Sequence, residues 1–206
     1  MADHYYSKDP SSASDVQTLT YEVGGRDYSF FSDHSVFSIQ RVDPGTDLLI
    51  RTVLKDQTQT EKILDLGCGY GPIGLVLADQ LGAKATLMDI NERAMDLARR
   101  GAAANHIDAE VVTEDLVTAV DYTLVATNPP IRAGKSTVYH FFALAYEHLK
   151  EGGVLYVVIR KQQGADSAVK ELKRVFGNCE TIGRQSGYHI LKSIKEYMHH
   201  QNSVIA

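Results

Sequence analysis

The stretch Asn128-Pro129-Pro130-Ile131 carries the most specific chemistry in this sequence. It follows the apolar run 122–127, which predicts a buried strand, so it stands at a strand's carboxyl end, where open α/β sheets bind ligands. The prolines remove backbone donors and leave acceptor oxygens from Asn128 and nearby carbonyls. Such a site suits a planar amine that must lose its conjugation before it acts as a nucleophile. The alternative is a strand-ending turn, because Asn-Pro pairs commonly mark turns.

A second motif, at 62–74, joins a short apolar strand to a glycine-rich loop. Gly67, Gly69 and Gly71 let backbone pass close to a ligand without Cβ clashes. The amphipathic helix that follows begins with free N–H groups and partial positive charge, which suit a carboxylate or a phosphate. Asp65 stands just before the loop, where its charge suits a ligand ammonium.

Asp89 ends the apolar run 85–88, and its carboxylate can accept both hydroxyls of a ribose. Residues 69–74 also match the dinucleotide fingerprint, with an acid about 20 residues on, so spacing alone leaves a nicotinamide dehydrogenase open. Two features oppose that alternative. The charge of Asp65 would repel a pyrophosphate, and Asn128-Pro129-Pro130 has no evident role in hydride transfer.

These motifs together resemble those of class I S-adenosylmethionine-dependent methyltransferases. The chain is most similar to the small-domain (MTS) methyltransferases related to the ribosomal small-subunit RNA guanine-N2 methyltransferase. The resemblance spans roughly residues 4–195. It rests on Asp65-x-Gly67-x-Gly69-x-Gly71, Asp89, Asp115, Asn128-Pro129-Pro130-Ile131-Arg132-Ala133-Gly134-Lys135, His4-Tyr5-Tyr6-Ser7, Val36-Phe37-Ser38 and Asp43-Pro44-Gly45-Thr46. The glycine loop is specific to the superfamily, and Asn-Pro-Pro narrows it to amino-group methylation.

The resemblance implies transfer of the S-adenosylmethionine methyl group to an exocyclic base nitrogen of RNA, with guanine N2 of ribosomal RNA as the expected target. Asn128, Pro129 and Pro130 would form the catalytic stretch. Hydrogen bonds from the base amine to Asn128 and to the Pro129 carbonyl would favour a pyramidal nitrogen. Positioning and electrostatics would dominate, with no strong general base, and the base would be flipped out of its stack.

The resemblance also assigns cofactor contacts. The expected set is Asp65, Gly67, Gly69, Gly71, Asp89, Ile90, Asp115, Leu116 and Asn128. Asp65 would bind the methionine ammonium, Asp89 the ribose and Asp115 the adenine amino group, while Ile90 and Leu116 would sandwich the adenine ring. The alternatives are structural: Asp65 and Asp89 as helix caps, and Asp115 as a turn residue.

Substrate contacts are harder to assign because the net charge is −5, whereas nucleic-acid binding rests heavily on phosphate neutralisation. Many amino-methylating relatives carry an aromatic residue directly after Asn-Pro-Pro, where this chain has Ile131, so base stacking would fall to Phe37 or Tyr188 or give way to aliphatic contact. A basic rim is expected near the carboxyl ends of adjacent strands, formed by Arg132, Lys135, Arg160 and Lys161. Ordinary solvated surface charge is the alternative for each of them.

The order of apolar segments predicts an α/β fold. Strands are expected near 62–67, 84–89, 109–113, 122–127 and 153–159, and helices near 46–54, 71–82, 92–104, 136–150 and 164–176. This alternation predicts a doubly wound, Rossmann-like parallel sheet, to which 179–183 and 188–192 add an antiparallel hairpin. The resemblance implies seven strands. An N-terminal hairpin, 19–23 and 26–31, turns through Gly24-Gly25.

We expect a single methyltransferase domain over 1–206, with an N-terminal extension and possible lid (1–45), a catalytic core (46–195) and a tail (196–206). The sequence has no apolar run of about 18 residues and only two cysteines, Cys68 and Cys179, so no membrane span and a cytoplasmic location are expected. No metal-ligand spacing occurs, and a monomer is favoured. Two other functions stay open: a methyltransferase acting on a small molecule or a protein glutamine amide, and a noncatalytic S-adenosylmethionine- or RNA-binding assembly factor.

Overall fold

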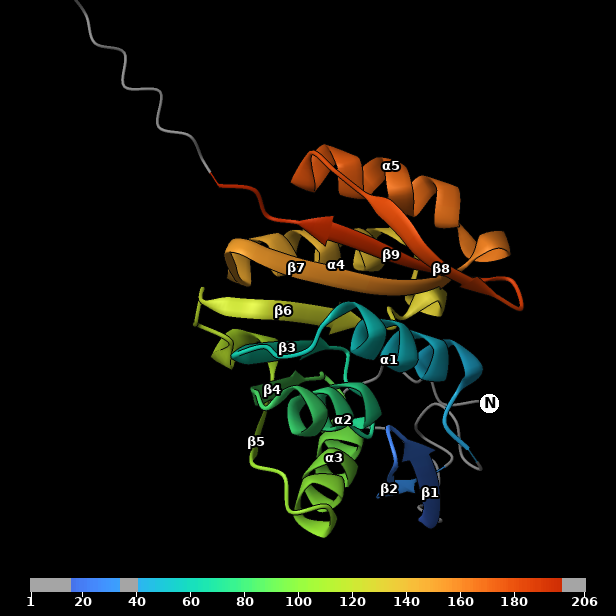
Figure 1. Cartoon of the computed structure of the whole chain (residues 1–206), viewed down its shortest axis with the longest axis vertical. Coiled ribbons are helices and arrows are strands. Elements are labelled where there is room, and N and C mark those ends of the chain that lie inside the picture. The colour runs from blue at the N-terminus through green and yellow to red at the C-terminus, as the bar shows by residue number, and fades with distance from the viewer. Residues whose placement is uncertain (1–15, 34–40, 198–206) are drawn as a thin grey trace, which may run out of the picture.

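A seven-stranded β-sheet with helices on both faces forms the body of the chain (Figure 1). The computed structural model describes residues 16–33 and 41–197. The spatial order of the strands is β5-β4-β3-β6-β7-β9-β8. Their bounds are β3 (Lys62–Leu66), β4 (Lys84–Met88), β5 (Ala109–Val112), β6 (Tyr122–Thr127), β7 (Leu149–Arg160), β8 (Glu180–Gln185) and β9 (Tyr188–Ile194). The first five pair in parallel, and β9 pairs antiparallel with both β7 and β8, which confirms the predicted mostly parallel sheet with its C-terminal hairpin.

The strand order reverses at β3. This strand pairs in parallel with β4 on one side and with β6 on the other, so Asp65 lies opposite Leu87 in one ladder and opposite Ala126 in the other. The carboxyl ends of β3, β4 and β6 therefore meet at one edge of the sheet. Ligands of open α/β sheets bind in the crevice outside such a point.

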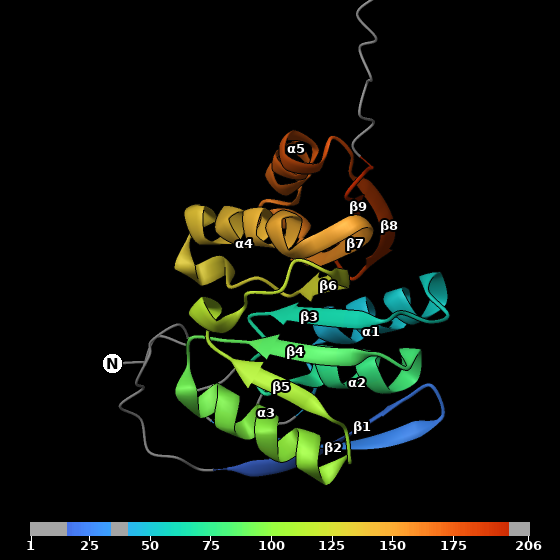
Figure 2. The same cartoon turned by 90° about the vertical axis from the view of Figure 1, so that its left-hand side faces the viewer.

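Two apolar cores sandwich the sheet (Figures 1 and 2). The first packs under α1 (Pro44–Asp56), α2 (Pro72–Leu81) and α3 (Glu92–Ala104), and the second under α4 (Lys135–His148) and α5 (Ala165–Phe176). In Figure 1, α1 and α2 lie on the viewer's side of the strands and α4 lies behind β7. Three short 3-10 helices, η1 (Glu114–Leu116), η2 (Ile131–Ala133) and η3 (Lys161–Gln163), follow the ends of β5, β6 and β7.

The N-terminal hairpin, β1 (Gln17–Val23) and β2 (Arg26–Ser32), packs onto the first core and not onto the sheet's edge. Its turn residues Gly24 and Gly25 have φ of 60° and 75°, a conformation that two-residue hairpin turns require and that glycine adopts most readily. Phe30 meets the ring of Tyr70 edge-on, with centroids 5.8 Å apart. Because Tyr70 belongs to the glycine-rich loop, the hairpin supports that loop from behind.

The predicted end of the fourth helix was wrong by two residues. We expected a helix to residue 150 and a strand from 153, but α4 ends at His148 and β7 begins at Leu149. The Nζ of Lys195 donates to the carbonyls of Tyr146 and Leu149 at 2.6 and 2.7 Å, and so satisfies oxygens at the helix end. Leu149 is itself buried in the second core. Lys195 is 46 residues from Leu149 in sequence, so the local sequence pattern could not predict this helix end.

We predict that Asn105→Ala will loosen the hairpin. The buried Asn105 side chain accepts from Ser29 N at 2.9 Å and donates to Ser29 O at 2.7 Å, so its loss strands two backbone groups. The expected cost is about 1–3 kcal/mol of unfolding free energy, measurable by urea or thermal unfolding. Gln162→Ala, at an exposed position on η3, is the control. Equal stability of both variants would show that Asn105 does not hold the hairpin.

Candidate functional site

The ends of β3 and β6 are joined side by side at the carboxyl edge of the sheet. Thr127 is the last residue of β6 and Leu66 the last residue of β3. The Oγ1 of Thr127 donates to the carbonyl of Leu66 at 2.7 Å. The glycine-rich loop leaves β3 at this point, and Asn128 leaves β6. The structure thus brings together the two motifs that the sequence places 61 residues apart.

The glycine-rich loop is tied to the neighbouring strand by backbone hydrogen bonds. Gly67 N and Cys68 N both donate to the carbonyl of Met88, at 2.8 and 2.9 Å. Gly71 is the N-cap of α2 and has φ of 92°, and a Cβ on it would lie 2.9 Å from Leu87. Both facts require glycine there. The loop is therefore a fixed cradle between β3 and β4.

Asp65 lies wholly buried beneath this loop. Its Oδ2 accepts the N–H of Gly74 in the first turn of α2 at 2.8 Å, which is the helix-capping role considered as the alternative. Its Oδ1 has no hydrogen-bond partner among the described residues. Burial, helped by the nearby charge of Asp89 and opposed by the Gly74 N–H, raises the pKa of Asp65 to about 7. One oxygen thus serves the fold, and the other is left for a donor from outside the described chain, as a ligand ammonium would be.

Asp89 is also buried, at the end of β4. Its Oδ1 accepts from Asn91 N at 2.9 Å and its Oδ2 from Gly69 N at 2.8 Å, so it ties the glycine loop to the next turn. Burial raises its pKa, and these backbone N–H groups oppose that effect. The cap of α3 is Asn91, whose side chain accepts from Arg93 N and Ala94 N, so the alternative that Asp89 caps this helix is wrong. Ribose binding by Asp89 stays a prediction, for which each carboxylate oxygen retains a lone pair.

The residues assigned to the adenine lie along the same edge. Ile90 follows Asp89 and is half-buried, whereas Leu116 on η1 exposes 61% of its surface. Asp115 is exposed, and its Oδ1 accepts from Thr113 Oγ1 at 2.6 Å. A large exposed leucine at this edge fits a wall for an apolar ring, although the turn-like contact of Asp115 is the one expected of a structural residue. These three assignments stay predictions.

The side-chain amide of Asn128 has a defined orientation. Its Nδ2 donates to Asp43 Oδ2 at 3.3 Å and to Thr46 Oγ1 at 3.1 Å. No donor from the described residues reaches its Oδ1 or the carbonyl of Pro129, whereas the carbonyl of Pro130 accepts from Ala133 N at 2.9 Å. Two free acceptors therefore stand together at the end of β6.

Asp43 and Thr46 are site residues that the sequence analysis missed. Asp43 is the N-cap of α1: its Oδ2 accepts from Thr46 N at 3.0 Å, and Pro44 begins the helix. The pattern Asp-Pro-Gly-Thr was a signal for that cap, since Asp at N-cap and Pro at N1 are both favoured. Nothing in the sequence placed this cap against Asn128, which is 85 residues on.

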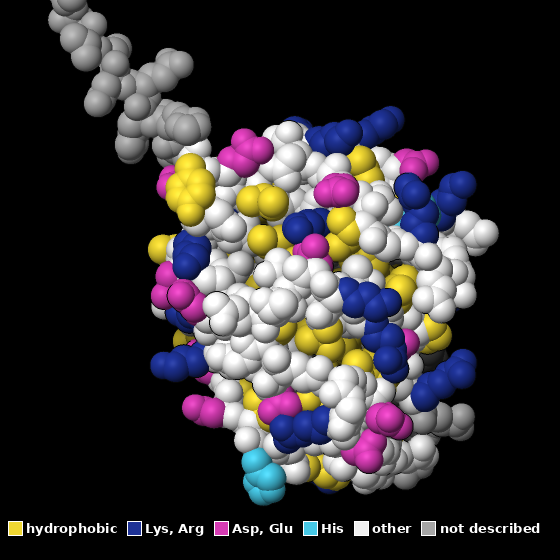
Figure 3. All heavy atoms as spheres, in the orientation of Figure 1, with side chains coloured by type: hydrophobic (Ala, Val, Ile, Leu, Met, Phe, Trp, Pro, Cys, Tyr) yellow, Lys and Arg dark blue, Asp and Glu magenta, His cyan; other side chains and the backbone are white. Residues whose placement is uncertain are grey.

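The four residues of the expected basic rim all lie at the carboxyl edge and are exposed. Arg132 and Lys135 follow β6, and Arg160 and Lys161 end β7 and begin η3. Among the described residues none of the four pairs with a carboxylate within salt-bridge distance. Elsewhere basic and acidic side chains are interspersed, as Figure 3 shows for one face. The positive charge available to a phosphate is therefore concentrated in this rim at the carboxyl edge of the sheet.

Tyr188 lies beside this rim and against the start of α1. A Cβ on Gly45 would come within 2.6 Å of its ring and within 3.0 Å of Asp43 Oδ2, so ring and carboxylate are close neighbours. The Arg160 guanidinium covers one ring face at 4.5 Å and donates to the Tyr188 hydroxyl at 2.8 Å. Stacking of Tyr188 on a base stays a prediction. Phe37, the other candidate, lies outside the described residues, as do residues 1–15 and 34–40 of the expected N-terminal extension.

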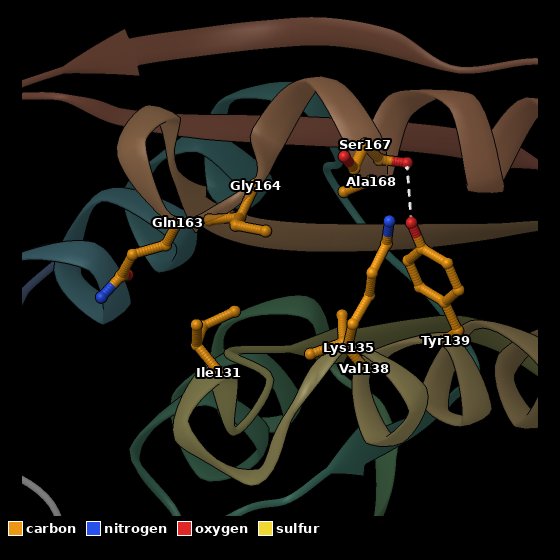
Figure 4. A pocket seen from close by; sticks show the side chains of 9 residues that line it. Ile131, Lys135, Val138, Tyr139, Gln163, Gly164, Ser167 and Ala168 are labelled. Carbon is orange, nitrogen blue, oxygen red and sulfur yellow. Dashed lines mark hydrogen bonds between the residues drawn. The ribbon is translucent and has the colours of Figure 1, made fainter.

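A hollow of about 200 Å³ opens next to Ile131, between the starts of α4 and α5. Figure 4 shows Lys135 and Tyr139 reaching from α4 toward Ser167 on α5, whose carbonyl accepts from the Tyr139 hydroxyl at 3.3 Å. Apolar side chains, including Ile131, Val138 and Ile159, line the rest. The hollow is separate from Asp65 and Asn128, so it adjoins the candidate site without forming its centre.

Two kinds of feature are absent from residues 16–33 and 41–197. No helix there is both long and apolar enough to cross a membrane. No group of three or more His, Cys, Asp or Glu side chains there is arranged to hold a metal ion.

Known proteins resemble this chain in sequence and in fold. The sequence profile of the "Methyltransferase small domain" family matches residues 27–192. The chain is 41% identical to the uncharacterized protein YbxB of Bacillus subtilis, over 95% of this chain and all of that one. It is 36% identical to the ribosomal RNA small subunit methyltransferase C of Actinobacillus pleuropneumoniae, over 80% of this chain and 51% of the relative.

Among solved structures, the fold resembles the T. thermophilus 16S rRNA N2 methyltransferase RsmC, in complex with AdoMet and guanosine. The TM-score is 0.80 and the identity 25%, over 91% of this chain and 52% of that one. The chain thus spans about half the length of the ribosomal RNA methyltransferases it matches.

We predict that Asp65→Asn will stabilise the protein in the absence of ligands, increasingly as pH rises. The folded pKa of about 7 lies above the unfolded value, so the folded state binds the proton more tightly and loses stability between about pH 4 and pH 7. Asn keeps an acceptor for the Gly74 N–H but carries no charge. The gain at pH 8 should be on the order of 4 kcal/mol, at about 1.4 kcal/mol for each pKa unit, and should largely vanish near pH 4.

Thermal unfolding of both proteins from pH 4 to pH 8 measures this effect. Asp96→Asn, at an exposed position on α3, should follow the parent profile throughout. A variant at Asp65 that is no more stable than the parent at pH 8 would show that this carboxylate is not held in an unfavourable setting.

Proposed function

Because the chain belongs to the methyltransferase small domain family, we propose that it transfers the methyl group of S-adenosylmethionine to an exocyclic amino group of an RNA base. The target we propose is guanine N2 of ribosomal RNA. The matched relative is named a ribosomal RNA small subunit methyltransferase, and the similar solved structure is that of a 16S rRNA N2 methyltransferase with guanosine. The observation that carries the proposal is the pair of free acceptors, Asn128 Oδ1 and the Pro129 carbonyl, at the end of β6. An amino group with two N–H donors is the complement of that pair.

The residues at the end of β3 and β4 fit S-adenosylmethionine. The buried, unpartnered Oδ1 of Asp65 would accept from the methionine ammonium, which also favours the ionised carboxylate. Gly67, Gly69 and Gly71, all with positive φ, would bring the loop backbone close to the ligand, and Asp89 would take the ribose hydroxyls. When bound, this cofactor supplies an electrophilic methyl group on a sulfonium.

Asn128 and Pro129 prepare the amine for that methyl. The nitrogen lone pair of a base amine is conjugated with the ring and is a poor nucleophile. Two hydrogen bonds, to Asn128 Oδ1 and to the Pro129 carbonyl, would hold the amine's hydrogens out of the ring plane. The nitrogen lone pair would then point toward the glycine-rich loop after β3, where the cofactor would bind. The acceptors gain strength as the nitrogen becomes cationic, which stabilises the transition state over the ground state. The proton can leave afterwards, so no general base is needed before transfer.

The exposed rim of Arg132, Lys135, Arg160 and Lys161 supports RNA as the substrate. These cations flank the acceptor pair and have no carboxylate partner among the described residues, so phosphates can bind them without displacing an ion pair. Both cysteines are unpaired, which suits a reducing, cytoplasmic setting. The net charge of −5 favours a second candidate, a small-molecule amine in the same site. Transfer of labelled methyl to RNA, or only to small molecules, separates the two.

We predict that Asn128→Ala will slow methyl transfer by roughly 10²–10³, the scale for losing one preorganised polar contact at a reacting centre. The loss should fall on kcat, because the contact strengthens as the amine pyramidalises. Single-turnover transfer to RNA measures it, and calorimetry with S-adenosylmethionine should give parental affinity. Asn128→Asp, which keeps an acceptor, should retain part of the activity. A parental rate for Asn128→Ala would reduce this residue to a turn former.

We predict that Lys161→Glu or Lys135→Glu will weaken RNA binding and flatten its salt dependence. Each removes one phosphate contact, so the slope of log affinity against log salt should fall by about 1. Filter binding of RNA over a salt series gives the slope, and cofactor affinity should not change. Lys84→Glu is the matched control, since this exposed lysine begins β4 at the opposite edge of the sheet. Equal effects at all three positions would mean that only net charge matters.

A further inference from the structure

We propose that Asp43 is a positioning residue for methyl transfer, whose carboxylate decides which end of the Asn128 amide faces the substrate. This inference rests on the proposed function and concerns the same site. Asp43 would not touch the substrate. It would act through Asn128, from the N-terminus of α1.

The two ends of an asparagine amide have nearly the same shape and opposite chemistry. Asn128 must present its oxygen to an amine, because the nitrogen end would offer a donor to a donor. Thr46 Oγ1 cannot choose between the ends, since a hydroxyl both donates and accepts. An ionised carboxylate accepts only, so the Asp43 Oδ2 that lies 3.3 Å from Asn128 Nδ2 admits the NH₂ end and repels the oxygen.

The Asp43 carboxylate is itself held in place. It is buried, and the same Oδ2 accepts the N–H of Thr46 at 3.0 Å as the cap of α1. Pro44 fixes the helix entry, and Gly45 leaves the space that Tyr188 and this oxygen occupy. An acceptor set by a helix start cannot follow the Asn128 side chain if it turns. The turned amide would lose its hydrogen bond to Asp43, and its oxygen would face a carboxylate.

The charge of Asp43 also reaches the reacting edge. Its Oδ2 lies 3.3 Å from Asn128 Nδ2, and burial, with a smaller contribution from the Asp43 charge, raises the pKa of Tyr70 in the glycine-rich loop. A negative charge behind the NH₂ group polarises the amide and makes Asn128 Oδ1 a stronger acceptor. That gain is largest when the amine nitrogen turns cationic, so it should appear in kcat.

Asp43→Asn tests this directly, because Asn caps helices about as well as Asp and the fold should survive. The oxygen of this amide must take the place of Asp43 Oδ2 to cap Thr46 N–H, so it still accepts from Asn128 Nδ2, and the variant removes only the charge behind the Asn128 amide. We expect kcat to fall roughly 10- to 100-fold in single-turnover transfer to RNA, with parental cofactor affinity and melting temperature. Asp43→Ser, a second good cap that is too short to reach Asn128, removes the acceptor as well as the charge and should lower kcat at least as far. Asp47→Asn is the control: this acid lies in the same helical turn but bonds to Tyr21 and Arg51.

The decisive readout is the double variant with Asn128→Ala. If Asp43 acts through Asn128, then adding Asp43→Asn to Asn128→Ala slows transfer no further. Losses that multiply, or a parental kcat for Asp43→Asn and Asp43→Ser, would overturn the positioning role while leaving the proposed function intact. A parental rate for Asn128→Ala alone would overturn both. A third outcome concerns the helix cap. If Asp43→Asn lowers both the melting temperature and kcat, and Asp43→Ser restores both, then Asp43 serves stability alone.

Discussion

The parallel pairing of β3 with both β4 and β6 is the constraint on which the rest of the site depends. It sets Asp65 opposite Ala126 and, through the hydrogen bond from Thr127 to Leu66, fixes where the two chains leave the sheet. The glycine-rich loop and the Asn128 stretch are far apart in sequence, and only the pairing of β3 with β6 makes them neighbours. A shift of β6 by one residue would turn Thr127 and the residues beside it to the opposite face.

Three buried carboxylates, Asp43, Asp65 and Asp89, stand at this one edge, and each is stabilised by a backbone N–H. Two of them work inside the protein: Asp89 ties the glycine loop, and Asp43 caps α1 and holds the Asn128 amide. Asp65 differs, because one of its oxygens has no partner in the described chain. A buried oxygen without a partner calls for a ligand, an ion or a water molecule, and in the proposed function the methionine ammonium takes that place.

Much of the architecture could be predicted from the sequence because its causes are local. Apolar runs of four to six residues between helical segments indicated the parallel strands, and Gly24-Gly25 indicated the hairpin turn. The errors and omissions have long-range causes. Lys195, just after β9, bonds to the carbonyls at the end of α4, Asn91 takes the cap that Asp89 was considered for, and Asp43 meets Asn128 only in the fold. The roles of individual side chains toward cofactor and base stay predictions. Ligand contacts depend on which donors and acceptors the fold leaves without partners, and a sequence does not show this.

In the proposed function, the acceptor pair at the end of β6 orients an amino group of ribosomal RNA, and S-adenosylmethionine supplies the methyl group. Mass-spectrometric mapping of methylated nucleosides in ribosomal RNA, from cells with and without this protein, tests it most directly. The account predicts one N2-methylguanosine that is lost without the protein and that returns with the parent chain but not with Asn128→Ala. Identical ribosomal RNA methylation in the presence and absence of the protein would contradict it.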